Sequence, residues 1–380
     1  MIKYITLCLF AACLLAGCRA QETESQSSSV SFDFLLSESQ PDQTLYSPVD
    51  LGIPYQERYT DPLAMTPYDL ILYKGRLYVA SGDWGGNAGP VEMLCYDTAQ
   101  EQWKSAGTLP DEEVYRFFVI EGTLVTPGID PREGWEWGNL YFLYEEGWET
   151  KRTIPGGVHC FDLAYRNGVL FAAVTVNRPG LHAAVSFDMG ESFNLVPLLK
   201  DGSLVTDTEH YFDLFVIAGE IYACCIYDLY RFDGTSFVYE TTWQDRVTPR
   251  YYNTPTKMRI FSSECVLGDT LYFTTGNFYA CTSPEEVRQI PTPAGERAYD
   301  IVSFKEELYL LCDLKTEEGY SVTVYRFLPE TEEFFTEVSF QSDIPAISLA
   351  IDENGYYFGL ASNNYKNQNH GRILKIEKND

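Results

Sequence analysis

The sequence YDLILYKGRLYVAS, residues 68–81, contains two short apolar runs joined by a turn at Gly75. Tyr, Leu, Ile and Val dominate both runs, and a Leu–aromatic pair opens the second one. Such a pattern predicts two antiparallel strands connected by a tight turn. Related stretches follow at residues 115–127, 161–174, 212–225, 263–275, 299–312 and 347–361.

These hairpins recur at intervals of 37 to 51 residues, measured between the residues that open the second strand. Those residues are Leu77, Leu124, Leu170, Ile221, Leu271, Leu308 and Tyr357. A second hairpin follows the first in most units, with an aromatic residue after its turn. We expect these aromatics, Trp103, Trp148, Phe193, Phe237 and Phe335, to fill the space between adjacent sheets.

Repeats of about 40–50 residues, rich in aromatic and branched residues and punctuated by Gly, Pro and Asp, are typical of β-propeller blades. No segment has a sustained helical period. The sequence therefore predicts an all-β fold, a seven-bladed β-propeller of four-stranded antiparallel blades, over residues 44–380.

The last unit lacks one strand, because the chain ends after residues 372–378. Residues 44–54 resemble the fourth strands of other units. We therefore expect this N-terminal strand to complete the last blade and close the ring, which would also cover exposed strand edges.

The N-terminus carries one basic residue, Lys3, and then an apolar run of about a dozen residues, which is too short to span a membrane and suits a signal peptide. It ends in Leu15-Ala16-Gly17-Cys18, which resembles the lipobox of bacterial lipoproteins. The resemblance implies a signal peptide over 1–17 and a lipid, including chains such as palmitate, on Cys18. In the alternative interpretation the signal is an ordinary secretory one and Cys18 is incidental.

Residues 18–43 are rich in Ser, Gln and Glu and contain few apolar residues. This composition predicts a disordered tether between lipid and propeller. We expect an extracytoplasmic protein of the bacterial cell envelope that is anchored to a membrane through the lipid on Cys18.

The charge excludes one class of partner. The chain has 27 basic and 55 acidic residues, a net charge of −28, which repels nucleic acid. We expect a monomer without a cofactor. Seven cysteines follow Cys18, most within apolar strands, which predicts buried thiols instead of a disulfide framework. The four histidines show no metal-ligand spacing, so no metal site is predicted.

The octet SFDMGESF, residues 186–193, resembles the Asp box of sialidases and related propellers. The matching residues are Ser186, Asp188, Gly190, Ser192 and Phe193. The resemblance implies a turn between the two outer strands of a blade, on the face opposite a ligand site. In that turn the short polar side chains bond the backbone and the aromatic packs inward.

Enzyme chemistry does not follow from this octet. In sialidases the first blade opens with an Arg-Ile-Pro-like segment, whereas the matching stretch here is Leu51-Gly52-Ile53-Pro54. Other glycosidases need two carboxylates roughly 5–10 Å apart, and an acidic sequence cannot identify such a pair. No catalytic residue is assigned, and whether the protein is an enzyme stays open.

Four units place an Asp between an aromatic and an aliphatic residue, six residues before the turn of the first hairpin. These are Asp69, Asp162, Asp213 and Asp300, and Arg116 takes the equivalent place in the second unit. Ring symmetry predicts that they converge at the mouth of the central channel. Either each Asp bonds the backbone of its own or the next blade, or together they line a pocket for a cation or a hydroxyl-rich ligand.

The loops expected on the same face are rich in aromatics. Candidate ligand-binding residues there are Trp84, Trp137 and Tyr252. Exposed aromatics beside amides and carboxylates suit sugar rings, although the tryptophans could instead fold back over the ring. We therefore expect a binding or scaffold module for a glycan or partner protein. The alternatives are a glycan-active enzyme and a structural or assembly lipoprotein of the envelope.

Overall fold

A computed structural model describes residues 45–206, 212–248 and 263–378. Contacts divide the chain into two units, Met1–Asp42 and Gln43–Asp380, and the second contains all the described residues. The predicted signal peptide, Cys18 and the predicted tether lie outside the described residues. Within the described ranges the single helix is η1 (Leu63–Met65), a 3₁₀ turn, and no helix there is apolar and long enough to cross a membrane.

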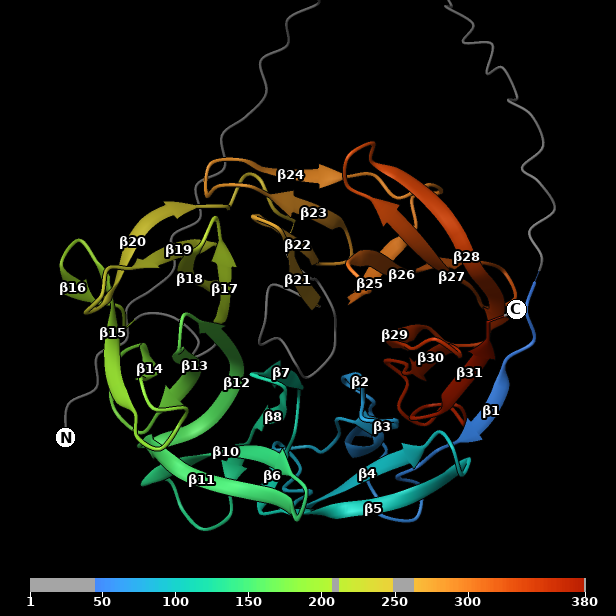
Figure 1. The fold of residues 1–380 in the computed structure, drawn as a ribbon, viewed down its shortest axis with the longest axis horizontal. Coiled ribbons are helices and arrows are strands. Elements are labelled where there is room, and N and C mark those ends of the chain that lie inside the picture. The colour runs from blue at the N-terminus through green and yellow to red at the C-terminus, as the bar shows by residue number, and fades with distance from the viewer. Residues whose placement is uncertain (1–44, 207–211, 249–262, 379–380) are drawn as a thin grey trace, which may run out of the picture. The chain divides into compact units, whose positions relative to one another are not determined.

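The unit is built from β-sheets arranged around a ring (Figure 1), which is a β-propeller. Five sheets have four antiparallel strands each. The first is β2 (Leu70–Tyr73), β3 (Arg76–Val79), β4 (Val91–Asp97) and β5 (Gln102–Leu109). The second is β7 (Phe118–Ile120), β8 (Thr123–Pro127), β10 (Trp137–Tyr144) and β11 (Gly147–Pro155).

The other three four-stranded sheets follow later in the chain. One is β21 (Ser263–Leu267), β22 (Thr270–Thr274), β23 (Phe278–Cys281) and β24 (Val287–Ile290). The next is β25 (Arg297–Phe304), β26 (Glu307–Lys315), β27 (Tyr320–Leu328) and β28 (Glu333–Ser342). The last is β29 (Ala346–Ile351), β30 (Gly355–Leu360), β31 (Ile373–Glu377) and β1 (Val49–Gly52).

The sixth sheet has eleven strands. It contains the run β12 (Gly157–Arg166), β13 (Val169–Val176), β14 (His182–Ser186), β15 (Asn194–Lys200). It also contains the run β17 (Asp213–Ile217), β18 (Glu220–Cys225), β19 (Asp228–Phe232), β20 (Phe237–Thr242). The short strands β6 (Asp111–Glu113), β9 (Ile129–Pro131) and β16 (Ser203–Leu204) join it.

The prediction of seven separate four-stranded blades is therefore confirmed in part, as a β-propeller with five such sheets. The difference arises because two four-strand runs join edge to edge. β15 pairs with β20 in parallel, through Leu198 with Phe237 and Leu199 with Val238. A few parallel hydrogen bonds between outer strands are enough to merge two sheets into one.

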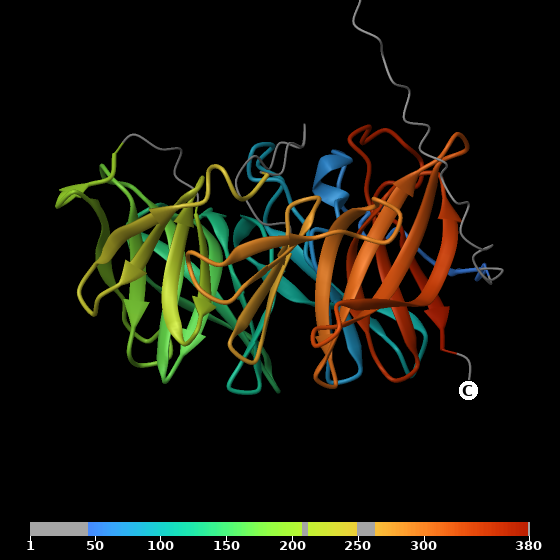
Figure 2. The ribbon, with the colours of Figure 1, turned by 90° about the horizontal axis from the view of Figure 1, so that it is seen from above.

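In each four-strand run the chain moves from the ring centre outward, so we call the strands A to D from inside to outside (Figure 1). The strands stand side by side in the perpendicular view, and their connections lie at the two faces (Figure 2). A–B and C–D turns lie at one face, whereas B–C loops and the connections to the next A strand lie at the other. We call the second of these the loop face.

The last sheet takes its D strand from the N-terminal side of the chain, as expected. β1 pairs antiparallel with β31, with Val49 opposite Lys375 and Asp50 opposite Leu374. Just before β1, Leu45 forms a parallel bridge to Ser339 of β28. The N-terminal segment 45–52 is thus hydrogen-bonded to two sheets built from C-terminal strands, β25–β28 and β29–β31. These contacts close the ring.

Aromatic residues fill the spaces between neighbouring sheets. Phe193 is buried among residues of the second sheet and of the β12–β15 run, and Phe237 is buried between the β12–β15 and β17–β20 runs. Trp148 packs between the first and second sheets, and Trp103 between the last and first. The prediction was wrong for Phe335, which is 42% exposed.

The register of β28 explains this error. Phe334 lies opposite Phe327, and Phe335 lies opposite Arg326. Successive residues of a strand point to opposite faces. Phe334 therefore packs against Phe278 and Phe327, whereas Phe335 faces outward under the Arg326 guanidinium.

In the turn at residues 186–193 two short polar side chains bond the backbone. The Ser186 hydroxyl accepts from the backbone N–H of Gly190 at 2.8 Å, and the Asp188 carboxylate accepts from the N–H of Ser192 at 2.9 Å. Gly190 has φ +86°, a conformation that favours glycine. The same turn docks on β11 of the preceding sheet, where Lys151 donates to the Met189 carbonyl at 3.0 Å and Thr153 to that of Gly190 at 2.6 Å.

Candidate functional site

Three aspartates at the A strands bond the backbone of the next four-strand run around the ring. Asp69 accepts from the N–H of Phe117 at 2.8 Å, Asp162 from that of Leu214 at 2.8 Å, and Asp300 from that of Leu349 at 2.7 Å. In each pair the donor belongs to the following unit. It comes one residue after the position that corresponds there to the Asp. The backbone-bonding interpretation of these aspartates is therefore correct for these three residues.

Two serines make the same kind of contact to a neighbouring sheet in units that lack the Asp. The Ser263 hydroxyl lies 3.3 Å from both the N–H and the carbonyl oxygen of Ile301 in the next sheet. The Ser348 hydroxyl donates to the Pro67 carbonyl at 2.8 Å, across the junction of the last and first sheets. Hydroxyl and carboxylate groups can both form hydrogen bonds with backbone groups. A serine can therefore make this contact in the units that lack the Asp.

Arg116 is paired with two carboxylates from other sheets. Its Nη1 lies 3.1 Å from Oδ1 of Asp162, and it also pairs with Glu264. Glu264 was missed by sequence analysis, because it follows the Asp-equivalent Ser263 and lies 148 residues from Arg116 in the chain. Asp162 and Asp213 have no exposed surface, so neither presents a carboxylate to solvent.

A cavity of about 630 Å³ lies among the A strands. Polar groups of Asp69, Arg116, Ser263, Glu264 and Asp300 line it together with apolar side chains. The apolar lining residues include Ile71, Val119, Val302 and Ile351. The structure thus brings Asp69, Arg116 and Asp300 together at one cavity, as ring symmetry predicted.

Burial controls the protonation of the aspartates at this cavity. Burial raises the pKa of Asp69 to about 7, and the nearby charge of Asp300 adds to the effect. Burial likewise raises the pKa of Asp300 to about 6. Backbone N–H groups and Arg116 oppose both shifts. Carboxylates that are already bonded and partly protonated near neutral pH are poor ligands for a cation.

Trp84 folds back over the loop face instead of standing free. It packs 4.8 Å from the His159 ring and joins a cluster with Tyr115, Ile129 and Phe161. Its backbone N–H donates to Glu113, a buried residue of β6. Trp84 therefore belongs to the packing of this face, in agreement with the second interpretation of these tryptophans.

Trp137 is 45% exposed, and Trp135 is 51% exposed. The other four tryptophans are buried or half-buried. Trp137 opens β10, and Trp135 lies in the loop between β8 and β10. Sequence analysis selected Trp137 as a candidate ligand-binding residue and did not select Trp135, which lies two residues earlier in the same loop.

The loop carrying these indoles is fixed by Arg152 of β11. Its guanidinium donates to the Trp137 carbonyl at 2.8 Å and to the Gly134 carbonyl at 2.9 Å. The Trp135 Nε1–H donates to Asp130 at 2.7 Å. Strand β9 inside the loop pairs with both β6 and β12. The loop therefore holds its exposed rings in a defined position.

Trp243 and the predicted ligand-binding residue Tyr252 both lie in the connection between β20 and β21. Trp243 is fully buried, stacked between Phe215 and Phe273, and donates from Nε1 to the Pro284 carbonyl at 2.8 Å. It belongs to the core, because the connection starts with a turn that packs between two sheets. Tyr252 lies outside the described residues.

Two further carboxylates with raised pKa values lie under the loop face. Burial raises the pKa of Glu113 to about 8, with a contribution from Asp83, and burial raises that of Asp111 to about 7. Asp111 accepts from Asn139 at 3.2 Å and from the Tyr141 hydroxyl. Both residues are almost completely buried, so they support the loops and do not face a substrate.

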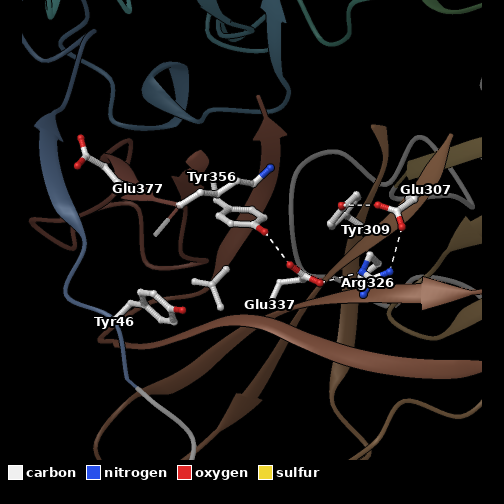
Figure 3. A pocket seen from close by; sticks show the side chains of 9 residues that line it. Tyr46, Glu307, Tyr309, Arg326, Glu337, Tyr356 and Glu377 are labelled. Atoms are coloured by element: carbon white, nitrogen blue, oxygen red, sulfur yellow. Dashed lines mark hydrogen bonds and ion pairs between the residues drawn. The ribbon is translucent and has the colours of Figure 1, made fainter. Parts of the chain in front are cut away.

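A second cavity, of about 410 Å³, lies at the junction of the β25–β28 sheet and the last sheet (Figure 3). A chain of hydrogen bonds crosses it. Tyr309 donates to Glu307, Arg326 donates to both Glu307 and Glu337, and Tyr356 donates to Glu337. Tyr46, Glu377 and Lys378 also line this groove. Arg231 and Glu240 occupy the positions of Arg326 and Glu337 in the β17–β20 run and also pair, a repeated signal that sequence analysis missed.

No group of three or more His, Cys, Asp or Glu residues within the described ranges is placed to hold a metal ion. The seven cysteines that follow Cys18 are free thiols, and all but Cys265 are buried. This agrees with the expectation that they serve as small apolar residues of the strands.

No known protein family matches the sequence, and no curated protein matches it. Among solved structures, a chain of the Mitotic Checkpoint Complex is 10% identical, with a TM-score of 0.52 over 91% of this chain and 99% of that chain. Sqt1 of Saccharomyces cerevisiae is 11% identical, with a TM-score of 0.48 over 85% of this chain and 98% of that chain.

A third similar structure is PorZ of Porphyromonas gingivalis, described as an essential bacterial surface component of the type-IX secretion system. It is 14% identical, with a TM-score of 0.49 over 81% of this chain and 46% of that chain. At such identities a likeness shows the fold alone. The likeness to the Mitotic Checkpoint Complex chain is therefore one of overall fold and says nothing of a binding site.

Proposed function

We propose that this protein is a lipid-anchored β-propeller of the bacterial cell envelope that binds glycans on its loop face. The Trp135 and Trp137 side chains form the contact surface, and the tether and the lipid on Cys18 hold the domain at the membrane. The LAGC stretch at residues 15–18 supports the anchoring.

The propeller in this proposal has seven blades. Five four-stranded sheets count as one blade each. The runs β12–β15 and β17–β20 each repeat the same A to D order and supply the remaining two. Their parallel contact involves two residue pairs at the outer edge, so it joins two blades without changing the course of either.

The observation that carries the function is the pair of exposed indoles in a fixed loop. A glycan ring buries its C–H face against an aromatic ring while its hydroxyls bond to polar neighbours. Here Asp130, Glu133 and Glu136 lie in the same loop, and Arg152 braces it. Because the loop is already ordered, binding need not spend free energy on ordering it.

The environment of the acidic residues favours binding over hydrolysis. A glycosidase needs a protonated and an ionised carboxyl group on either side of an accessible bond. Glu113, Asp69 and Asp111, whose pKa values burial raises, are themselves hydrogen-bonded within the fold. They stabilise the loop face and the ring.

The direct test is retention on a glycan array that includes bacterial envelope polysaccharides. We expect wild type to bind one glycan class, and the variant Trp135→Ala/Trp137→Ala to lose at least about tenfold in affinity, since it removes the apolar surface of two indoles from the contact with the sugar. Its melting temperature should stay near that of wild type, because both side chains are exposed.

Phe187→Ala is the matched control. Phe187 is an exposed aromatic, 68% accessible, in the C–D turn at the other face of the ring. Its removal should leave retention unchanged. If wild type is retained on no glycan, or if the double Trp variant is retained as well as wild type, the proposed function is wrong.

A further inference from the structure

A different part of the molecule contains a prearranged polar site, the groove shown in Figure 3. It is independent of the indole pair. Glu307 opens β26 and Tyr356 lies near the start of β30, so the groove lies toward the A–B turns. The loop that carries Trp135 and Trp137 is a B–C loop at the opposite face.

The side chains of this groove hold one another in place. Tyr309 donates to Glu307 at 3.0 Å, and Arg326 donates to Glu307 and Glu337 at 2.9 Å each. Tyr356 donates to the second oxygen of Glu337 at 3.1 Å. Each carboxylate oxygen therefore has one donor, and each keeps a further lone pair for another. The guanidinium likewise has N–H groups beyond the two it uses here.

Among the hydrogen-bonded side chains of this groove, the charged ones are accessible to solvent whereas the tyrosines are not. The side chains of Glu307 and Arg326 are 41% and 30% exposed, and Tyr309 and Tyr356 are buried. Buried tyrosines fix the angle of the carboxylates, and the carboxylates present their remaining acceptor positions to a ligand. The cavity volume falls within the range of about 300–1,000 Å³ that small-molecule sites occupy.

The charge balance selects the kind of ligand. Three carboxylates, Glu307, Glu337 and Glu377, and two cations, Arg326 and Lys378, line the groove. A further cation would compete with Arg326 for carboxylates that are already paired, and an anion would approach three negative charges. A hydroxyl group both donates and accepts, so it can bond to a carboxylate and to the guanidinium at once.

We propose that the groove between β28 and β30 binds a neutral, hydroxyl-rich ligand, a sugar residue, through Glu307, Arg326 and Glu337. Tyr46, from the N-terminal segment, lines this groove beside the last two sheets, and its backbone N–H donates to the Ser339 carbonyl. A bound sugar would therefore contact the segment that closes the ring.

Saturation-transfer NMR tests this with the full-length chain in a detergent without a sugar headgroup. The Trp135→Ala/Trp137→Ala background removes any signal from the loop face, so the result does not depend on the proposed function. The probes are maltose, N-acetylneuraminate as an anion and L-arginine methyl ester as a cation. We expect transfer to maltose alone.

Arg326→Met should weaken maltose binding about tenfold or more, since a hydrogen bond to a charged group contributes about 1.5–3 kcal/mol. Tyr356→Phe removes only the hydroxyl that orients Glu337, and it should weaken binding severalfold even if Arg326→Met folds poorly. Arg288→Met is the control, because Arg288 pairs with Glu332 on the exposed surface. It should bind maltose as its parent does.

Three results would overturn the proposal. The first is that the parent chain gives no transfer to maltose. The second is that it prefers N-acetylneuraminate or the arginine ester. The third is that Arg326→Met and Tyr356→Phe bind maltose as well as the parent does, in which case the hydrogen-bond chain only joins two sheets.

Discussion

The Asp300 carboxylate and the Leu349 backbone N–H, 2.7 Å apart, join two neighbouring sheets at the centre of the ring. The Asp69–Phe117 and Asp162–Leu214 pairs repeat this contact elsewhere. Three A strands are thus tied to the next one by a hydrogen bond from a backbone N–H to a carboxylate, in addition to apolar packing between the runs. The aspartates of the repeat serve to hold the ring together.

Replacing Asp300 by Ala should therefore destabilise the propeller. It leaves the buried N–H of Leu349 without a partner, which costs about 1–3 kcal/mol in the free energy of unfolding. Urea denaturation followed by tryptophan fluorescence measures the loss. Glu149→Ala, at an exposed position of β11, is the control and should change stability by less than about 0.5 kcal/mol. Equal stability of Asp300→Ala and wild type would show that the contact contributes nothing.

Stability should fall as the pH rises from about 5 to 8.5. Burial raises the pKa values of Asp69, Asp111, Asp300 and Glu113 to between about 6 and 8, well above the values near 4 of the unfolded chain. The folded state therefore binds more protons over this range. The stability from these groups is fully present below the unfolded pKa and is lost as the pH passes the folded pKa.

Asp111→Asn isolates one of these groups. It should reduce the slope of unfolding free energy against pH by about 1.4 kcal/mol per pH unit between the unfolded and folded pKa values of Asp111. His370 acts in the opposite sense, because burial lowers its pKa, and it is present in both proteins. Parallel slopes for the variant and wild type would contradict the assignment of Asp111.

The turn at residues 186–193 should loosen locally when Asp188 is replaced by Ala. The Ser192 and Ser186 hydroxyls and the Ser192 N–H bond its carboxylate and lower its pKa to about 2. We expect faster hydrogen exchange at the Ser192 amide with little change in the global melting temperature, because Asp188 is exposed. Unchanged exchange at Ser192 would mean that other contacts fix the turn.

The proposed anchor has a simple test. Replacing Cys18 by Ser removes the thiol to which the lipid would be attached, so the protein should move from the membrane fraction to the soluble fraction and lose labelling by radioactive palmitate. Cys265→Ser, which changes a thiol within β21, should leave both unchanged. Membrane retention of Cys18→Ser would contradict the lipoprotein assignment.

The repeat pattern predicted the propeller because alternation along a strand and the spacing of turns are local properties of the sequence. Features that depend on register or on distant sheets were not predictable in this way. A shift of one residue exchanged the roles of Phe334 and Phe335. The parallel pairing of β15 with β20 joins strands whose contact depends on the final spacing of two sheets.

The site was predicted less completely for the same reason. Ring symmetry correctly brought Asp69, Arg116 and Asp300 to one cavity. It could not show that Glu264 pairs with Arg116, because the two residues come from units far apart in the chain. The contact of Arg326 with Glu337 does have a counterpart in the repeat, since Arg231 and Glu240 occupy the matching positions of the β17–β20 run and pair at 2.7 Å. The sequence also could not show which loop tryptophans are exposed. Trp84 packs on His159, whereas Trp135 and Trp137 are open to solvent.

The most direct test of glycan binding at the loop face is ¹⁹F NMR of the full-length chain labelled with 5-fluorotryptophan, which gives one resonance for each of its six tryptophans. Single Trp→Phe variants assign the resonances of Trp135 and Trp137. On titration with the glycan retained best by the array, we predict that these two resonances shift while that of the buried Trp243 stays in place. Saturable binding that leaves both resonances unmoved would contradict the account.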